Sequence, residues 1–278
     1  MHHWQSLGAA IMLVTASLGA QAAEQNWTVE GGSLKIMKSC ARFVDIQPNG
    51  SGHQVTVAAR ADQDGEISQL RVSGGDAATI DINSTHCYKS GAFSDGPTLA
   101  LTIKVPDGTA IAVTDGGVAK YTIGAVGGTL NLSLAGASGL KAVGAKTLTL
   151  ELAGAGNADI GQAGDSKLHT SGAGDVKIHT LKGSVDAKLA GAGNLTVDAI
   201  DSGAVTLSAA GRSDIKIGKG NIGDFSLDSA GASDVVVDAV VANAKVSLAG
   251  AGEVKFAKLT GTISQSIAGI GKVSVLEH

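Results

Sequence analysis

The sequence predicts an all-β protein, a single-stranded parallel β-helix (β-solenoid) with about 18–20 residues per coil. Two observations lead to this prediction. A glycine-rich block recurs eight times, its first glycines 18, 18, 19, 20, 20, 19 and 19 residues apart, and apolar and polar residues alternate around each block. A repeat of this length is typical of one supersecondary unit stacked many times. The first glycines of the blocks are Gly136, Gly154, Gly172, Gly191, Gly211, Gly231, Gly250 and Gly269.

The residues around each block predict strands. Two apolar residues with one residue between them follow a block, as in Val176-Lys177-Ile178, and Leu150-Glu151-Leu152 precedes one. Alternation with a period of two indicates a strand with one buried face. No apolar spacing of 3.6 residues persists in this region, and frequent glycines oppose a helix. The residues that we expect to point into the core include Ile178, Val197, Ile217 and Val237.

The coil length predicts a thin rod. Nineteen residues at about 3.3 Å each give roughly 63 Å of chain, enough for two or three short strands joined by tight corners. Stacked coils then pair as parallel strands about 4.8 Å apart. The usual handedness of crossovers between parallel strands predicts right-handed winding.

We expect three segments in the chain. Residues 129–275 form the regular coils, and residues 24–128 form an irregular N-terminal β region that starts the stack and carries a cap. A cap is expected because an uncovered end coil presents unpaired backbone groups. Asn49-Gly50-Ser51-Gly52 in this region reads as a hairpin-style connection.

Residues 1–23 are interpreted as a secretory signal peptide. The stretch from Leu7 to Leu18 is apolar, and Ala20-Gln21-Ala22 is a cleavage motif of small residues. An uncleaved membrane anchor is the alternative, but about 12 apolar residues are too few to span a bilayer. We therefore expect an exported protein of the periplasm, the outer surface or the medium, with no membrane span in the mature chain.

The two cysteines, Cys40 and Cys87, lie in the N-terminal region. An even count in an exported protein favours a disulfide, which would staple the cap. Two alternatives remain open: a pair of buried free thiols, or a metal site that includes the neighbouring His86. Two cysteines and one histidine fall short of a closed zinc site.

Two sets of motifs resemble a known family. The first is Leu-Thr-Ile-Lys-Val-Pro-Asp-Gly at 101–108, which leads through Gly124 and Gly128 to Leu-Asn-Leu-Ser-Leu at 130–134. The second is the iterated block Gly-Ala-Gly-Asp-Val-Lys-Ile at 172–178 and Gly-Ala-Gly-Asn-Leu-Thr-Val at 191–197. The chain resembles the auto-transporter adhesin head GIN domain family of bacterial envelopes. The resemblance covers most of the mature chain and implies an exported parallel β-helix with an adhesin-like role and no established catalytic residues.

A polar residue follows most of the glycine blocks, and stacked coils would bring these residues into a column with a pitch of about 4.8 Å. We call this column the polar ladder. It could form a row of weak cation or carbohydrate sites, since carboxylates on adjacent coils concentrate negative charge. Alternatively, its side chains accept hydrogen bonds from backbone N–H groups at corners, which would explain every member. The members are Asn157, Asp175, Asn194, Asp214, Asp234 and Glu253.

The glycine blocks also predict a strip of small residues. If Leu134 points inward, strict alternation places Gly136 inward and Ala135 and Ala137 outward. Repeated along the rod, the alanines would form a flat surface suited to self-association or to an envelope partner. The alternative is that the chain turns a corner at the glycines and buries one alanine per coil.

The composition excludes several classes of function. A net charge of −4 gives no electrostatic footprint for nucleic acid, and 3% aromatic residues offer no stacking platform. No catalytic triad, P-loop or dinucleotide motif is present, so we expect no catalytic residue, cofactor or metal. The function expected is that of a non-enzymatic exported envelope or surface protein, adhesin-like or structural, with a cell-surface or matrix polysaccharide or an envelope protein as partner. The alternative is a carbohydrate-active enzyme or polysaccharide-binding protein on a β-helix scaffold.

Overall fold

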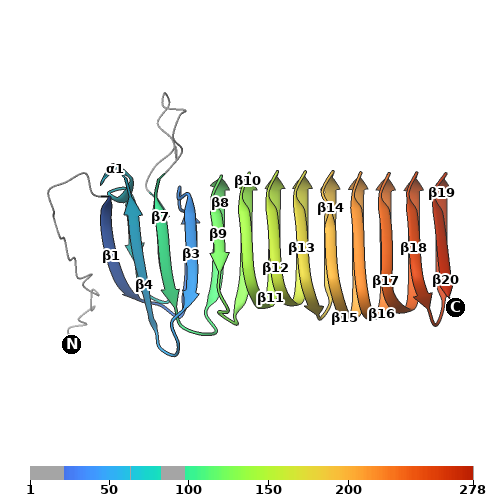
Figure 1. Ribbon diagram of the computed structural model, residues 1–278, viewed down its shortest axis with the longest axis horizontal. Coiled ribbons are helices and arrows are strands. Elements are labelled where there is room, and N and C mark those ends of the chain that lie inside the picture. The colour runs from blue at the N-terminus through green and yellow to red at the C-terminus, as the bar shows by residue number, and fades with distance from the viewer. Residues whose placement is uncertain (1–21, 63, 83–97, 278) are drawn as a thin grey trace, which may run out of the picture.

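The computed structural model describes residues 22–62, 64–82 and 98–277. The chain forms an elongated all-β solenoid of about nine turns with almost no helix, and its strands stack along the long axis (Figure 1). The predicted all-β solenoid is therefore confirmed, whereas its right-handed winding stays a prediction. Most of the proposed signal peptide lies outside the described residues and stays a prediction. Among the described residues, no helix is long and apolar enough to cross a membrane.

Each regular coil contributes one rung to each of two faces. In the first face, parallel rungs run from β7 through β3 and β9 to β20, and their register is unbroken along most of the rod. The rungs of this face are β7 (Ala100–Val105), β3 (Phe43–Pro48), β9 (Lys120–Ile123), the first halves of β11 (Gly139–Gly154) and β12 (Asn157–Gly172), β13 (Asp175–Lys182), the first halves of β15 (Leu195–Gly211), β16 (Asp214–Gly231) and β17 (Asp234–Gly250), then β18 (Glu253–Leu259) and β20 (Lys272–Glu277).

The second face is built in the same way from the other half of each coil. Long strands such as β11 pass from the first face to the second around a corner, whereas other coils use two separate strands, as β13 and β14 do. The rungs of this face are β6 (Ala78–Ile82), β2 (Ser33–Lys38), β8 (Ala110–Gly117), β10 (Thr129–Gly136), the second halves of β11 and β12, β14 (Val185–Gly191), the second halves of β15, β16 and β17, and β19 (Ile263–Gly269).

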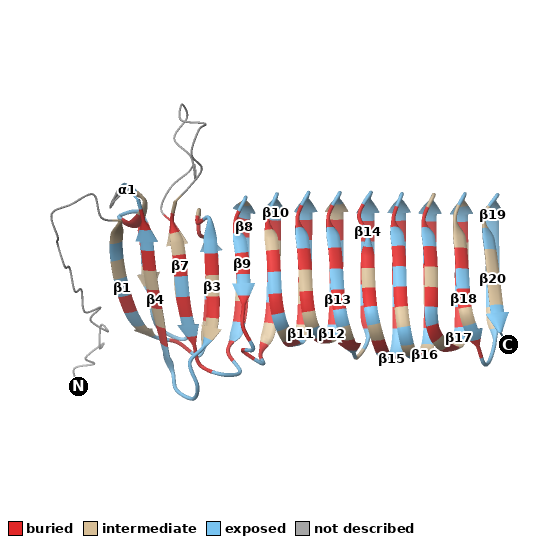
Figure 2. Ribbon diagram, viewed as in Figure 1, coloured by how far each residue is buried: buried red, intermediate tan, exposed pale blue. Residues whose placement is uncertain are grey.

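The core lies between the two faces, where alternate residues of the rungs are buried, except in β19 and β20 at the C-terminal end (Figure 2). The inward positions predicted at Ile178, Val197, Ile217 and Val237 are confirmed, because no more than 2% of any of these residues is exposed. Near the C-terminal end, the rings of Phe225 and Phe256 pack edge to face with centroids 5.2 Å apart.

One column of glycines runs through the corner of every regular coil. From Gly136 onward these residues have φ between +88° and +136°, a conformation that favours glycine. A Cβ atom at these positions would lie 2.2–2.4 Å from the carbonyl oxygen of the glycine one coil earlier. The residue after each glycine forms a backbone hydrogen bond between coils. For example, the N–H of Ala192 donates to the carbonyl oxygen of Gly172 at 2.8 Å. The members are Gly117, Gly136, Gly154, Gly172, Gly191, Gly211, Gly231, Gly250 and Gly269.

The N-terminal end is closed by antiparallel strands. On the first face, β1 (Ala23–Glu30) pairs with β4 (Gln54–Ala61) and β4 with β7, and on the second face β5 (Leu70–Ser73) pairs with β6. The short helix α1 (Asp64–Ile67) lies beside β1 and β4, and Trp27 and Ile67 are buried there. The hairpin expected at residues 49–52 is wrong: the segment joins β3 to β4, but β7 lies between these two strands.

The predicted disulfide involves Cys87, which lies outside the described residues. Cys40 lies just after β2 with φ of +46°. The disulfide between Cys40 and Cys87 stays a prediction.

We predict that Gly191→Ala lowers the free energy of unfolding by about 3 kcal/mol, because alanine is strained at φ +123° and its methyl group would collide with the carbonyl of Gly172. Gly203→Ala is the matched control, since a Cβ atom there meets nothing within 4 Å. Urea denaturation of both variants measures the difference. Equal stability of the two would contradict the steric role of the column.

We also predict that Ile217→Asp destabilises the rod by roughly 4 kcal/mol, because it buries an unpaired charge. Ile217 is 1% exposed, whereas the adjacent Lys216 is exposed. Lys216→Asp introduces the same side chain on the outer surface and should change stability by no more than about 0.5 kcal/mol. Thermal unfolding of the two variants tests the register, which an unchanged melting curve for Ile217→Asp would refute.

Candidate functional site

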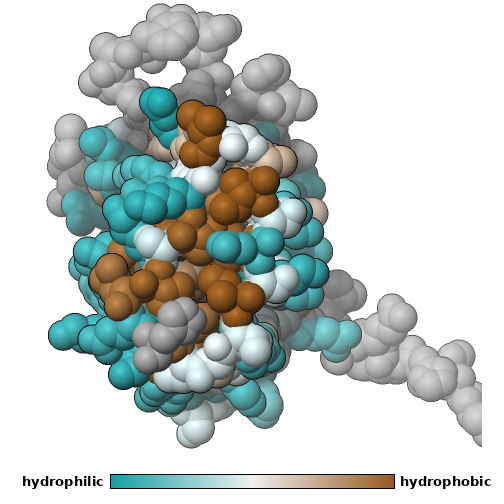
Figure 3. Space-filling model, turned by 90° about the vertical axis from the view of Figure 1, so that its right-hand side faces the viewer, coloured by the Kyte–Doolittle hydropathy of each residue, from teal (hydrophilic) through white to brown (hydrophobic). Residues whose placement is uncertain are grey.

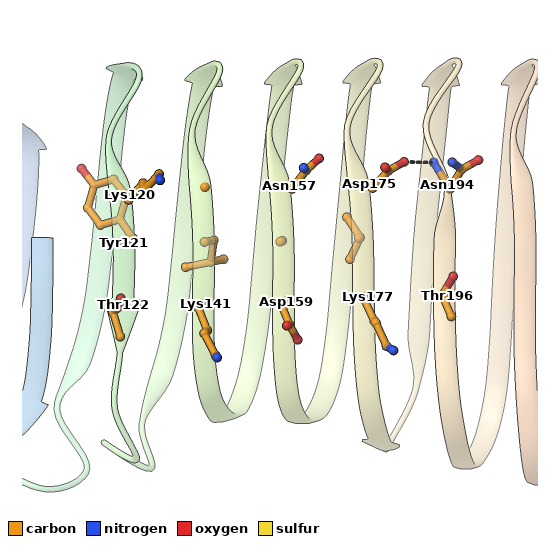
Figure 4. A pocket seen from close by; sticks show the side chains of 14 residues that line it. Lys120, Tyr121, Thr122, Lys141, Asn157, Asp159, Asp175, Lys177, Asn194 and Thr196 are labelled. Atoms are coloured by element: carbon orange, nitrogen blue, oxygen red, sulfur yellow. Dashed lines mark hydrogen bonds between the residues drawn. The ribbon is translucent and has the colours of Figure 1, made fainter. Parts of the chain in front are cut away.

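A shallow groove of about 600 Å³ crosses five consecutive rungs of the first face, β9, β11, β12, β13 and β15 (Figure 4). It runs along the rod, across the strands. Its side chains come from two outward columns two residues apart on each strand, together with the backbone and buried residues between them. The residues that line it are Lys120, Tyr121, Thr122, Gly139, Leu140, Lys141, Asn157, Ala158, Asp159, Asp175, Val176, Lys177, Asn194 and Thr196.

The hollow forms because one of these columns contains a glycine. Gly139 lies in register between Lys120 and Asn157, and a Cβ atom there would meet only the side chain of Lys120, at 3.7 Å. The second column presents longer side chains, including Lys141 and Lys177 (Figure 4). The groove is therefore lined by amide, hydroxyl, carboxylate and ammonium groups at the spacing of the rungs.

The polar ladder forms the first of these columns and extends beyond the groove. Asp175 Oδ1 accepts the backbone N–H of Asn194 at 3.2 Å, and Asn194 Oδ1 accepts that of Asp214 at 3.2 Å. Asp234 Oδ1 accepts the N–H of Glu253 at 3.0 Å. These bonds favour the interpretation in which the ladder satisfies backbone groups at the corner. The described residues contain no group of three or more side chains placed to hold a metal ion.

A charged cluster beside the groove was not predicted from the sequence. His179 lies between two carboxylates of neighbouring rungs, with Nδ1 2.8 Å from Asp198 and Nε2 2.9 Å from Asp159. Lys177 Nζ lies 3.3 Å from Asp198. Desolvation tends to raise the pKa of the Asp198 carboxyl, but hydrogen bonds from Lys177 and His179 outweigh it and lower that pKa. Part of the signal was available, because Asp198 lies 19 residues and one coil after His179, whereas Asp159 is in register with Lys177, two residues before His179.

A buried polar cluster joins the N-terminal region to the regular coils. Asp115 occupies an inward position that Leu134 fills one coil later. Its carboxylate accepts hydrogen bonds from the hydroxyls of Ser39 and Tyr121 and, at 2.9 Å, from the N–H of Gly116. Burial, reinforced by the charge of Asp115, raises the pKa of Tyr121 well above its usual value. The aspartate at an inward position of the alternating run 111–115 was the sequence signal.

The predicted alanine strip is exposed, but its explanation needs correction. Ala135 and Ala137 are exposed, as alternation predicted, yet Gly136 between them is exposed as well. The reason is that the chain turns a corner at Gly136, where φ is +88°. The turn does not bury one alanine per coil, so the alternative interpretation is wrong on that point. Binding by this strip stays a prediction.

Comparisons with known protein families and with curated proteins find no match. Among solved structures, a "putative adhesin" from Parabacteroides distasonis is similar, with 14% identity, a TM-score of 0.52, and coverage of 92% of this chain and 98% of that chain. A "putative adhesin" from Bacteroides fragilis has 16% identity, a TM-score of 0.43 and coverage of 92% and 98%. A "putative lipid binding protein" from Parabacteroides distasonis has 15% identity, a TM-score of 0.43 and coverage of 92% and 96%. The first of these likenesses supports the fold alone.

We predict that Tyr121→Phe costs about 1–3 kcal/mol at neutral pH, because buried Asp115 loses a donor. The raised pKa of Tyr121 also predicts the direction in which stability changes at high pH. Above about pH 10 the unfolded chain loses the tyrosine proton while the folded chain keeps it, so stability falls as pH rises. Denaturation at about pH 9 and pH 11 should show a smaller loss in Tyr121→Phe than in the unmodified protein. Thr122→Val, on the exposed neighbour, is the control, and equal losses in all three proteins would contradict the prediction.

Proposed function

We propose that the protein is a non-enzymatic, exported, adhesin-like surface protein that binds an acidic polysaccharide along the groove of the first face. The observation that carries this proposal is the shape of the groove, which crosses five rungs and is open along the rod. Four intervals of about 4.8 Å give a length of roughly 19 Å. A surface with repeating polar groups over this length suits an extended, repeating partner better than a compact ligand.

The lysines of the groove support an anionic partner, although Asp159 and Asp175 also line it. Within the described part of the chain, Lys120 and Lys141 form no ion pair, and both are exposed at the end of the groove nearer the N-terminal cap. Lys177 is already paired with Asp198. The two lysines could therefore contact carboxylate or sulfate groups, while Asn157, Asn194 and other polar side chains bond sugar hydroxyls.

Export and family membership are parts of the same proposal. The signal-peptide pattern of residues 1–23 supports export. The motifs at 172–178 and 191–197 support a relationship to the GIN domain family. Two of the similar structures carry the word adhesin in their names, which agrees with a role in surface contact.

Replacing Lys120 and Lys141 together with alanine should weaken binding to an acidic polysaccharide roughly tenfold, because each exposed ionic contact contributes up to about 1 kcal/mol. Binding should also weaken with added salt. The measurement is biolayer interferometry of the purified protein on immobilised uronic-acid polymers and on neutral glucans. The double variant Lys216→Ala/Lys245→Ala removes two exposed lysines outside the groove and should bind as the unmodified protein does.

Equal binding of acidic and neutral polymers, or equal loss in the two double variants, would contradict the proposal. Binding to cell envelopes that survives enzymatic removal of polysaccharide would instead indicate an envelope protein as partner. Release of shortened oligosaccharides during incubation would support the alternative of a carbohydrate-active enzyme, for which Asp159 and Asp175 are the carboxylates that line the groove.

A further inference from the structure

One aromatic ring lies on the outer surface, beside the groove. Phe43 is 44% exposed, whereas no other aromatic residue that the structure describes is more than 8% exposed. These buried aromatic residues are Trp27, Tyr121, Phe225 and Phe256. Seen along the rod from its C-terminal end, hydrophobic side chains gather at the centre and hydrophilic side chains surround most of them (Figure 3). A single exposed apolar residue is common on protein surfaces, so the position of Phe43 decides what it can do.

Phe43 extends the first outward column of the groove by one rung. β3 pairs in parallel with β9, and Phe43 is the register partner of Lys120. Lys120 is in turn the partner of Gly139, where the groove is hollow. On its other side Phe43 is paired with Ala100, which has only a small side chain. The column therefore presents an aromatic ring, an ammonium group and then the hollow at successive intervals of about 4.8 Å.

A second cation accompanies the ring. The Cζ atom of Arg42 lies over Phe43, 5.4 Å from the ring centroid, and Arg42 is exposed. Among the residues that the structure describes, Arg42 has no carboxylate partner. The guanidinium stacks through its flat face, whereas its N–H groups lie in its plane and remain available to an anion. The nearest aspartate in β3, Asp45, accepts a hydrogen bond from Gln47 Nε2 at 2.6 Å.

We propose that Phe43 and Arg42 form a sugar subsite at the end of the groove, where the ring stacks on the apolar face of a pyranose and the guanidinium binds a sugar carboxylate. This inference rests on the proposed function and specifies the class of acidic polymer, a polyuronate built of six-membered rings. The C–H bonds on one face of a pyranose suit the negative face of an aromatic ring. A guanidinium matches the two oxygens of a carboxylate.

The low aromatic content of the chain does not exclude such a subsite. With 3% aromatic residues the sequence predicts no stacking platform, but one ring is enough where it lies in line with the groove. An anionic polymer without sugar rings, such as polyphosphate, can contact Arg42 and Lys120 but has no pyranose face for Phe43. The two polymers therefore separate the contribution of the ring from that of the charges.

Biolayer interferometry on immobilised polygalacturonate and on immobilised polyphosphate, at equal ionic strength, tests the subsite. Phe43→Ala should weaken binding to polygalacturonate about threefold to tenfold, as expected for the loss of one aromatic stack, and leave binding to polyphosphate unchanged. Phe43→Leu keeps an apolar side chain without a flat ring and should lose nearly as much. Phe43→Trp should bind polygalacturonate at least as well as the unmodified protein.

Two further variants serve as comparisons. Arg42→Gln should weaken binding to both polymers, because its charge acts on either anion. Met37→Ala removes a similarly exposed apolar side chain, 48% exposed, from β2 on the second face, and should bind both polymers as the unmodified protein does. Melting curves followed by circular dichroism report whether each variant remains folded. In Phe43→Trp, polygalacturonate should also change the tryptophan emission, and the unmodified protein should show no such change.

The outcomes distinguish the subsite from the groove. If the unmodified protein binds neither polymer, the proposed function fails and the subsite fails with it. If the Lys120→Ala/Lys141→Ala variant loses binding to polygalacturonate but Phe43→Ala does not, the groove stands and the subsite alone is refuted. Equal losses on the two polymers in Phe43→Ala, an equal loss in Met37→Ala, or full binding by Phe43→Leu would also refute stacking at Phe43.

Discussion

The close approach of neighbouring coils at the glycine column is the constraint on which the other features depend. A backbone carbonyl occupies the space that a Cβ atom would need, so each coil must place a glycine at the same corner as the coil before it. This requirement keeps the coils between 18 and 20 residues long and in register. Register in turn decides which residues face the core, because a shift by one residue would turn every side chain of a strand to the other face.

The same constraint explains which parts of the fold were predictable. The glycine period and the alternation around it predict the solenoid and the inward positions of Ile178 and Ile217, since both depend on local backbone geometry. The strand order of the N-terminal cap depends on contacts between segments far apart in the chain. Nothing local in residues 49–52 indicates that β7 will separate β3 from β4.

The candidate site also has parts that local sequence predicts and parts that depend on contacts it does not reveal. The polar ladder could be predicted as a column, because its members lie one coil apart. The groove could not, because it depends on the absence of a side chain at Gly139 and on the long side chains beside it. His179 and Asp198 lie one coil apart, but a spacing alone does not show that their side chains turn toward each other, and Asp159 is offset by two residues from the rung position of His179. Asp115 was missed because one of its two hydroxyl donors, Ser39, lies 76 residues away in the sequence, although the other, Tyr121, lies only six residues away.

The amino-acid type can vary most at the outward columns of a solenoid of this kind. Core columns are largely apolar and the corner column is glycine, whereas an outward position is restrained mainly by its neighbours one coil away. A column can therefore hold lysine, aspartate, lysine and threonine on successive rungs, as it does at Lys141, Asp159, Lys177 and Thr196. Each rung adds a polar group at a fixed distance from the last. This regular spacing of polar groups is the physical basis of the proposal that the groove binds a polymer.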